Sequence, residues 1–314
     1  MAVVRATREG SAIDVRDLVK RYGQTTAVDG ISFAVPYGDV FAFVGTNGAG
    51  KSTTIGCLTT VLPFDRGRVS VAGLDVRTSG EQVRRRIGVV FQEPLLDPLL
   101  TVRENLVLRG VLSAMAGPRI RVRIDSLTAV MGMEDFVDQR YGTLSGGQKR
   151  RADVARALLH EPEIVFLDEP TAGLDPAGRA SVWETLQHLR ASGEVTIFLT
   201  THYLEETEEA DRVCVVDRGR VVADDSPAAL RARHSRSILR ITTDDAPALL
   251  ALAERSGASA ERAGDRVEVG VSGAATALEL LRSHGEHVLD FEFRHGSMDD
   301  VFLALTGLAP ERNR

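Results

Sequence analysis

The arrangement of hydrophobic positions predicts two kinds of strand in the first two thirds of the chain. Residues 13–15 and 31–35 alternate between apolar and polar side chains, as in strands with one buried face, and 68–76 reads as a strand followed by a turn. Other strands consist of continuous apolar residues, as expected where both faces of a parallel sheet are covered. These runs are residues 40–44, 87–91, 164–167 and 195–200.

The pattern becomes helical between about residues 101 and 160, where Leu, Arg and Ala are frequent and apolar positions recur at helical spacing. Strand-like runs return at 213–216 and 220–223, and the residues Asp217-Arg218-Gly219 between them indicate a closing hairpin. Strands that alternate with helices in this way indicate an α/β fold.

The chain changes character after Asp225. Ser226 and Pro227 have the residue types of a helix cap and first turn, and the remainder alternates between candidate strands and helices. These candidates are residues 238–242, 246–255, 266–271, 274–283, 288–293 and 298–305. We predict a larger domain at about 10–228 and a small α/β accessory domain at 229–314.

Length and composition fit a cytosolic globular protein of about two domains. The chain has 314 residues, of which 43% are hydrophobic, and no run approaches the ~18 apolar residues that cross a bilayer. Residues 1–5 lack the apolar segment of a secretory signal. Cys57 and Cys214 are too few for a disulfide framework and lack metal-ligand spacing, so we expect them to be buried or half-buried. The net charge of −6 argues against nucleic acid as a partner.

Residues 45–52 follow the Gly-x-x-x-x-Gly-Lys-Ser pattern of a phosphate-binding loop. They are Gly45, Thr46, Asn47, Gly48, Ala49, Gly50, Lys51 and Ser52. Glycines let backbone N–H groups wrap around an anion at the start of a helix. The lysine supplies charge to the outer phosphates, and the serine hydroxyl can hold Mg²⁺. The apolar run before the loop and the helix start after it argue against a chance glycine-rich turn.

Two acidic residues follow the apolar run 164–167. Asp168, at the end of a buried strand, is placed to hold Mg²⁺ directly or through water. Glu169 is placed to orient and deprotonate an attacking water. Alone, this pair would read as polar residues at the exit of a strand. The segment 170–176, Pro-Thr-Ala-Gly-Leu-Asp-Pro, favours the functional interpretation.

Residues 144–148, Leu-Ser-Gly-Gly-Gln, precede another helix. Ser145 offers a hydroxyl, the two glycines offer free N–H groups, and the helix that begins near Gln148 adds its positive end, so the segment can contact an anion. Taken alone, it is an ordinary loop. The basic residues 149–151 that follow are expected to form a solvated helix face.

In their order along the chain these motifs resemble those of the nucleotide-binding subunit of an ATP-binding cassette (ABC) transporter, over about residues 10–225. The resemblance assigns ATP contacts to an aromatic residue, the phosphate loop, the signature motif and the D-loop. These residues are Tyr22, Gly45–Thr53, Ser145, Gly146, Gly147, Gln148 and Asp175. It also assigns three catalytic residues and three metal-binding residues. The catalytic ones are Gln92, Glu169 and His202, and the metal-binding ones are Ser52, Gln92 and Asp168.

The resemblance implies a P-loop NTPase (RecA-like) core with an antiparallel β subdomain and a helical signature subdomain at about 95–160. It implies ATP and Mg²⁺ as cofactors. It also implies a head-to-tail homodimer, because the family's signature motif closes on the nucleotide of the other subunit. Separate membrane permease subunits would hold the chain at the cytoplasmic face of the membrane. Residues 93–106 are the candidate docking segment, with part of their apolar side chains expected in the core.

The tail of the chain narrows the subfamily. Residues 296–307, together with 144–176 and 200–223, are similar to the ABC-2 export group, and within it to the daunorubicin-resistance type. Val301, Phe302 and Leu305 also fit a simple packing helix. The resemblance implies export of a drug-like, antibiotic or lipid-linked compound.

Two alternatives remain. One is a soluble non-transport ABC ATPase that acts on a ribosomal or nucleic-acid partner. A single cassette, the lack of a long coiled-coil insertion and the acidic charge disfavour it. The other is a binding module with a decayed site, which the intact motif residues disfavour.

Overall fold

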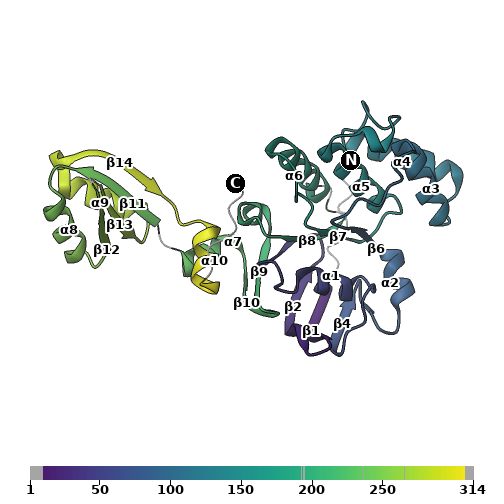
Figure 1. Ribbon diagram of the computed structural model, residues 1–314, viewed down its shortest axis with the longest axis horizontal. Coiled ribbons are helices and arrows are strands. Elements are labelled where there is room, and N and C mark those ends of the chain that lie inside the picture. Colours follow the sequence, from purple (N-terminus) through teal and green to yellow (C-terminus); the bar gives the residue numbers. More distant parts are fainter. Residues whose placement is uncertain (1–9, 192, 194, 236, 265, 308–314) are drawn as a thin grey trace. The chain divides into compact units, whose positions relative to one another are not determined.

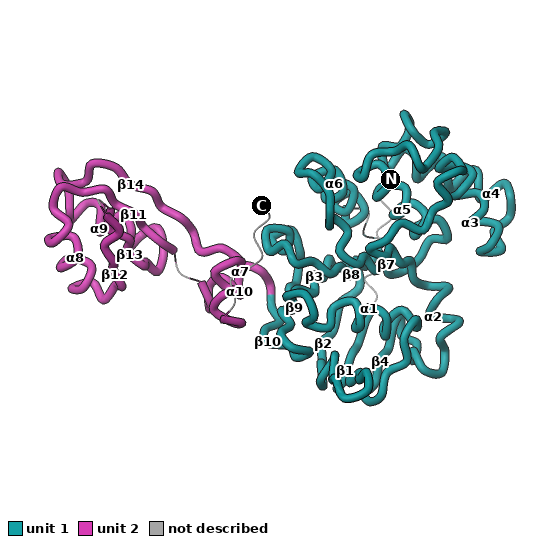
Figure 2. Tube along the Cα trace, viewed as in Figure 1, with its two compact units in different colours: residues 1–225, 311–314 teal, residues 226–310 magenta. Residues whose placement is uncertain are grey.

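The computed structural model describes residues 10–307 apart from 192, 194, 236 and 265, and the chain forms two compact units (Figure 2). Unit 1 ends at Asp225, and unit 2 begins at Ser226. Residues 1–5, which bear on the question of a secretory signal, lie outside the described part of the chain. Cys57 and Cys214 are both buried, as predicted.

A six-stranded sheet forms the centre of unit 1 (Figure 1). Its strands are, in spatial order, β10 (Arg220–Asp225), β9 (Arg212–Asp217), β3 (Val40–Val44), β8 (Thr196–Thr201), β7 (Ile164–Asp168) and β6 (Ile87–Val90). The strands from β9 to β6 run parallel, and β10 closes the predicted hairpin with β9. The side chains of β3, β7 and β8 are buried, which explains their apolar sequences.

A four-stranded antiparallel sheet packs against the central sheet. Its strands are, in spatial order, β2 (Thr25–Pro36), β1 (Ser11–Tyr22), β4 (Arg66–Val71) and β5 (Leu74–Asp75). Phe33 of β2 stacks on Phe41 of β3 with 5.4 Å between ring centroids, and Phe43 and Phe198 join the same cluster. Burying a phenylalanine side chain stabilises the fold by about 1.5–3 kcal/mol relative to leaving it exposed. Because these rings come from both sheets, their burial holds the two sheets together.

The helices of unit 1 connect these strands. They are α1 (Lys51–Leu58), α2 (Gly80–Arg86), α3 (Val102–Leu112), α4 (Gly117–Val130), α5 (Gly146–Leu158) and α6 (Pro176–Ala191), with 3₁₀ helices η1 (Tyr141–Thr143) and η2 (Leu204–Glu209). The segment predicted to be helical contains α3, α4 and α5. A capping box begins α3, in which the side chains of Thr101 and Glu104 each accept the other's backbone N–H.

Unit 2 contains another four-stranded antiparallel sheet. Its strands are, in spatial order, β12 (Ser259–Ala263), β13 (Arg266–Val271), β11 (Ser237–Thr243) and β14 (Val288–Arg294). Its helices are α7 (Pro227–His234), α8 (Ala246–Arg255), α9 (Ala274–His284) and α10 (Met298–Thr306), with the 3₁₀ helix η3 (Gly285–His287). Leu239 of β11 packs with Leu249 of α8 and Leu280 of α9 in a buried cluster. Sequence analysis missed β12, because Ser-Ala-Glu-Arg-Ala has neither an apolar run nor β-branched residues.

Candidate functional site

The phosphate loop joins β3 to α1, and two of its positions tolerate only glycine. Gly50 has φ +100°, and a Cβ there would meet the Ala27 carbonyl oxygen at 2.4 Å. A Cβ on Gly45 would meet the Val216 carbonyl oxygen at 2.5 Å. Gly50 is also the N-cap of α1 and brings no side chain to the first turn. The first N–H groups of the helix therefore stay available to an anion.

The Lys51 side chain is buried against this loop. The residue is 5% exposed, and its ammonium donates to the carbonyl oxygens of Gly45 at 2.8 Å and Thr46 at 3.3 Å. The Glu169 carboxylate is the third neighbour, with 3.4 Å between Lys51 Nζ and Oε1. Lys51 thus joins the loop to the end of β7, where an ammonium can neutralise the charge of a bound phosphate.

Three oxygen-bearing side chains meet where β7 and β8 end. The parallel register places Asp168 beside Thr200, whose hydroxyl donates to Asp168 Oδ1 at 2.6 Å. The Ser52 hydroxyl at the start of α1 donates to the same oxygen at 3.3 Å. Hard oxygen ligands of this kind are those that Mg²⁺ prefers. The side chains of Ser52 and Asp168 therefore fit the metal expected from the sequence.

Glu169 adopts a left-handed backbone conformation, with φ +45°. For a residue with a side chain this costs on the order of 1–3 kcal/mol, and such residues cluster at functional sites. Its N–H donates to the Thr200 hydroxyl at 3.0 Å. Its carboxylate lies between the Lys51 ammonium and the His202 ring, with 3.3 Å between Oε2 and His202 Nδ1. The turn therefore directs the carboxylate toward the phosphate loop.

A buried carboxylate that the sequence analysis missed holds the segment carrying His202. Glu206 is 7% exposed and accepts hydrogen bonds from the hydroxyls of Thr171 and Thr201. Thr171 lies just after β7, and Thr201 immediately precedes His202. Glu206 therefore joins the two segments that supply the acid and the histidine of the site. In the sequence it is one of several glutamates of η2, and no local pattern distinguishes it.

Lys51, Ser52, Glu169 and His202 line one pocket of about 690 Å³. The carboxyl ends of parallel strands lie at the same edge of a sheet, and ligands commonly bind there. This pocket lies at that edge. Tyr22 borders it and is half exposed, with the Lys20 ammonium 5.0 Å from the ring centroid. The predicted site residues that line it are Tyr22, Asn47, Gly48, Gly50, Lys51, Ser52, Thr53, Gln92, Glu169 and His202.

Five of the remaining predicted residues line a second pocket, namely Ser145, Gly146, Gly147, Gln148 and Asp175. The other four, Gly45, Thr46, Ala49 and Asp168, line neither of these two pockets. Ser145 and Gln148 form a capping box at the N-terminus of α5, with 2.9 Å between the Ser145 nitrogen and Gln148 Oε1. Asp175 accepts the Gly178 N–H at 3.0 Å at the start of α6. Within one chain, the signature residues therefore face a different pocket from the one that contains Lys51.

The expectation of a solvated helix face at residues 149–151 is wrong for Arg150. This residue is 7% exposed, and its guanidinium donates to three backbone carbonyl oxygens. Helical spacing places it on the same face of α5 as the buried residues Val154 and Ala157. Arginine is rarely buried unless its charge has partners. The prediction failed because the partners here are carbonyl groups of other segments, which the sequence around Arg150 does not reveal.

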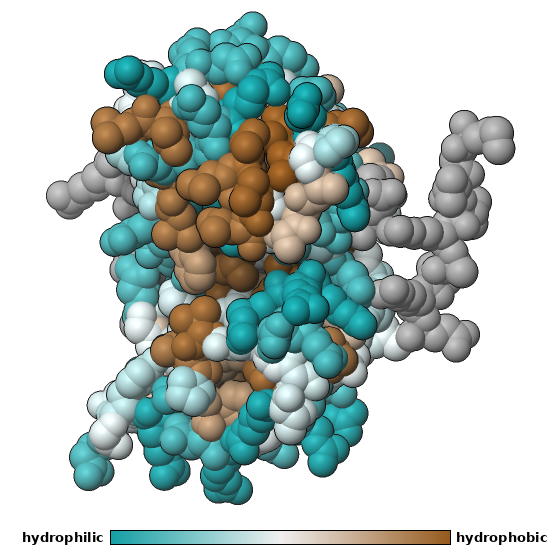
Figure 3. Space-filling model, turned by 90° about the vertical axis from the view of Figure 1, so that its right-hand side faces the viewer, coloured by the Kyte–Doolittle hydropathy of each residue, from teal (hydrophilic) through white to brown (hydrophobic). Residues whose placement is uncertain are grey.

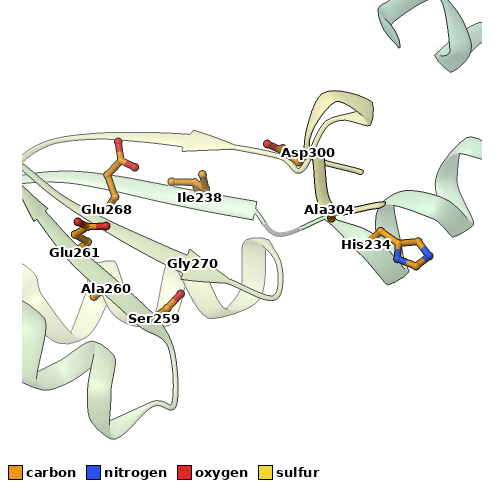
Figure 4. Close-up of a pocket in the computed structure, with 9 residues that line it drawn as sticks. All are labelled: His234, Ile238, Ser259, Ala260, Glu261, Glu268, Gly270, Asp300 and Ala304. Atoms are coloured by element: carbon orange, nitrogen blue, oxygen red, sulfur yellow. The ribbon is translucent and has the colours of Figure 1, made fainter. Parts of the chain in front are cut away.

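A further pocket lies within unit 2, on the face of the sheet opposite the buried cluster (Figure 4). Two of its three carboxylates have arginine partners. Glu268 accepts a hydrogen bond from Arg240 at 2.7 Å, and Asp300 accepts one from Arg294 at 2.9 Å. Among the described residues, no group of His, Cys, Asp or Glu has the geometry of a metal site. We assign this pocket no catalytic role.

Comparison with known sequences places the chain among ATP-binding proteins of exporters. Residues 28–172 match the ABC transporter family. The chain is 40% identical over 312 residues to the daunorubicin/doxorubicin resistance ATP-binding protein DrrA of Streptomyces peucetius, covering 96% of this chain and 94% of that protein. It is 39% identical over 301 residues to the Nod factor export ATP-binding protein I of Ralstonia nicotianae, covering 94% of each.

Solved structures share the fold over most of the chain. cbiO1 from Clostridium perfringens, part of the ABC transporter complex cbiONQ, superposes with a TM-score of 0.67 at 32% identity, covering 71% of this chain and 92% of its own. The ATP-binding cassette MJ0796, in a dimeric post-hydrolysis state bound to ADP and Pi, superposes with a TM-score of 0.62 at 26% identity. That match covers 68% of this chain and 98% of the cassette.

Proposed function

The chain belongs to the ATP-binding subunits of ABC transporters, and on that basis we propose that it powers export of a drug-like, antibiotic or lipid-linked compound through a separate membrane subunit. Hydrolysis of ATP coupled to transport is the activity of this family, and its P-loop fold with an antiparallel β subdomain is the one predicted from the motifs. The cargo class is supported by the relatives, which are a daunorubicin/doxorubicin resistance protein and a Nod factor export protein.

The pocket that contains Lys51 is the proposed ATP site. The N–H groups of the phosphate loop and of the first turn of α1 would hold the inner phosphates. Lys51 would neutralise the outer ones. Tyr22, half exposed at the border of this pocket, offers an aromatic face for the adenine ring.

Ser52, Gln92 and Asp168 would hold Mg²⁺. Ser52 and Asp168 already share a hydrogen bond of 3.3 Å, and Gln92 lines the same pocket. When bound, the ion would neutralise the negative charge of the phosphate oxygens. The Thr200 hydroxyl donates a hydrogen bond to the Asp168 carboxylate. Hydrogen bonds of this kind orient the side chains that bind a metal.

Hydrolysis requires a water placed in line with the outer phosphate. We assign Glu169 to orient this water and accept its proton, and His202 to contact the outer phosphate. One observation carries the assignment: the Glu169 carboxylate lies 3.4 Å from the Lys51 ammonium and 3.3 Å from His202 Nδ1. The proton acceptor is thus adjacent to the two groups that would face the phosphate.

A second copy of the chain would complete the site. The signature residues 145–148 and Asp175 line a pocket of their own. A head-to-tail dimer with two-fold symmetry would bring this surface of one copy to the nucleotide of the other. The dimeric structure of the cassette MJ0796 supports such an arrangement.

The membrane subunit would dock on an exposed apolar patch at α3, α4 and the loop before them. Figure 3 shows hydrophobic side chains gathered on this side of the molecule. The exposed large apolar residues of these segments are Leu95, Leu99, Val107, Leu108, Val111, Leu112, Val122 and Val130, which are 39% to 75% exposed. Surfaces of this kind mark protein interfaces, and a short cytoplasmic helix of an ABC-2 type permease is the proposed occupant. Leu96, Val102 and Leu106 are buried, so the segment 93–106 divides between core and surface.

No helix among the residues that the structure describes is long and apolar enough to cross a bilayer. The proposed location at the cytoplasmic face of the membrane therefore rests on the permease and the docking patch.

Inverted membrane vesicles test the proposal. Vesicles that contain this chain and its membrane subunit should accumulate daunorubicin or a Nod factor, the compounds named for its relatives, only when Mg-ATP is present. The Glu169→Gln variant should abolish uptake while remaining bound to the vesicles. A chain that hydrolyses ATP yet never associates with membranes that contain the subunit would contradict the export role.

A further inference from the structure

Arg150 of α5 connects the ends of two strands that carry the ATP site. Its Nη1 donates to the Phe91 carbonyl oxygen at 2.5 Å, its Nη2 to that of Asp168 at 2.9 Å and its Nε to that of Pro170 at 2.7 Å. Burial lowers the pKa of Arg150, while the nearby carboxylates of Asp153 and Asp168 favour its charged form. A buried guanidinium with three backbone acceptors is a fixed element of the structure.

Two of these bonds hold the carbonyl groups on either side of Glu169. The Nε–Nη2 edge of arginine is a rigid planar fork, and its two acceptors here belong to Asp168 and Pro170. Glu169 has φ +45°, a conformation that persists only where the surroundings over-determine it. A fork bound to both flanking carbonyl groups supplies such a constraint.

The third bond reaches the strand that precedes Gln92. β6 and β7 pair in parallel up to Val90 and Leu167. Beyond this last pair, Arg150 bridges the next residue of each strand, Phe91 and Asp168. The guanidinium therefore continues the link between the strands where the backbone ladder ends.

Two more side chains extend this contact along β6, the edge strand of the sheet. Arg156 donates to the Val89 carbonyl oxygen at 2.6 Å, and His160 Nε2 lies 2.9 Å from that of Ile87. Together with the bond from Arg150 to Phe91, these contacts give side-chain partners to the carbonyl groups of Ile87, Val89 and Phe91. They cover an edge of the sheet that would otherwise be open. The row holds α5 against β6, and Arg150 stands at the end nearest the ATP site.

We propose that Arg150 is a positioning residue for hydrolysis, whose guanidinium fork fixes the turn from Asp168 to Pro170 and thereby aims the Glu169 carboxylate at the attacking water. The inference rests on the role proposed above for Glu169. Helix α5 would then have two roles. Its first residues, the signature residues, would contact the nucleotide of the other copy, and its Arg150 would hold the base of its own chain in place.

The Arg150→Lys variant tests the fork, because lysine keeps the charge but cannot reproduce two parallel hydrogen bonds. We expect kcat to fall by on the order of ten- to a hundredfold, while Kd for a non-hydrolysable Mg-ATP analogue stays within about twofold. The matched control is Arg123→Lys. Arg123 donates to the Leu158 carbonyl oxygen and lines neither the Lys51 pocket nor the signature pocket, so the kcat of this variant should stay within about twofold.

A double-mutant cycle separates positioning from general damage. In the Glu169→Gln background, Arg150→Lys should lower the residual rate no further, because the group that it positions has lost its function. Unchanged kcat in folded Arg150→Lys, or losses that simply add in the double variant, would overturn the inference. If Arg150→Lys does not fold, Arg150→Gln is judged by the same two outcomes. If Glu169→Gln alone leaves kcat intact, the assignment of the base fails instead.

Discussion

The Lys51 ammonium lies 3.4 Å from the Glu169 carboxylate, and the two side chains are 4% and 13% exposed. One belongs to the phosphate loop and the other to the turn after β7, so the pair joins the proposed phosphate-binding cation to the proposed base. Opposite charges interact more strongly when water is excluded. Removing either member leaves the other unpaired in a largely buried site, which is costly.

The Lys51→Ala variant should lose affinity for ATP. Loss of a buried cation that faces an anionic ligand costs about 2–5 kcal/mol, so we expect Kd for Mg-ATP, measured by calorimetry, to rise on the order of thirtyfold or more. Turnover at subsaturating ATP should fall with it. Unchanged binding and unchanged turnover would remove Lys51 from the site.

The Glu169→Gln variant keeps the size of the side chain and removes the proton acceptor. We expect kcat to fall by about 10²–10⁴-fold, the usual contribution of a positioned base. Bound ATP should then persist and hold the protein as a dimer, which size-exclusion chromatography in Mg-ATP would detect. Normal turnover in this variant would mean that another residue is the base.

The Thr200→Val variant should weaken both acidic residues at once. The Thr200 hydroxyl donates to Asp168 Oδ1 and accepts the Glu169 N–H, and a buried polar group left without its partner costs about 1–3 kcal/mol. We expect a lower kcat and a higher Mg²⁺ concentration for half-maximal activity.

Thr185→Val is the control for this change, since the Thr185 hydroxyl donates within α6 to the Ser181 carbonyl oxygen. Equal effects of the two substitutions on the Mg²⁺ requirement would contradict a role for Thr200 at the metal site.

Stability should fall below neutral pH partly through His160. Burial lowers the pKa of this imidazole from its usual 6.5, so the unfolded chain binds a proton more readily than the folded one. The contribution to stability is therefore complete above pH 6.5 and is lost as pH falls toward the lower folded pKa, by up to about 1.4 kcal/mol per pH unit.

The His160→Gln variant can still donate to the Ile87 carbonyl oxygen but does not titrate. Urea unfolding between pH 5 and 7 should show a smaller loss of stability for this variant than for the wild type. An unchanged slope in His160→Gln would contradict the prediction.

A chain that ends at Asp225 should retain ATP binding. Every residue that lines the proposed nucleotide pocket belongs to unit 1, and the two sheets of that unit share their own buried core. We expect a folded protein by circular dichroism, with Kd for Mg-ATP close to that of the full chain. A truncated chain that folds without binding ATP would refute the proposed domain boundary.

The sequence by itself determined the phosphate loop, the buried strands and the family. These features are local: an apolar run such as 40–44 needs both faces covered wherever it lies, and Gly50 permits a backbone conformation that other residues avoid. The order of the motifs along one chain then identified the ABC cassette, which the relatives confirm.

Only the tertiary structure decided which polar side chains are buried and what they hold. Arg150 and Glu206 resemble exposed residues in the sequence, because partners such as Asp168 and Thr171 are distant along the chain. The separation of the signature residues from the Lys51 pocket is likewise a property of packing. Burial of a charge is favourable only where several acceptors converge on it, and that convergence exists only once the strands are side by side.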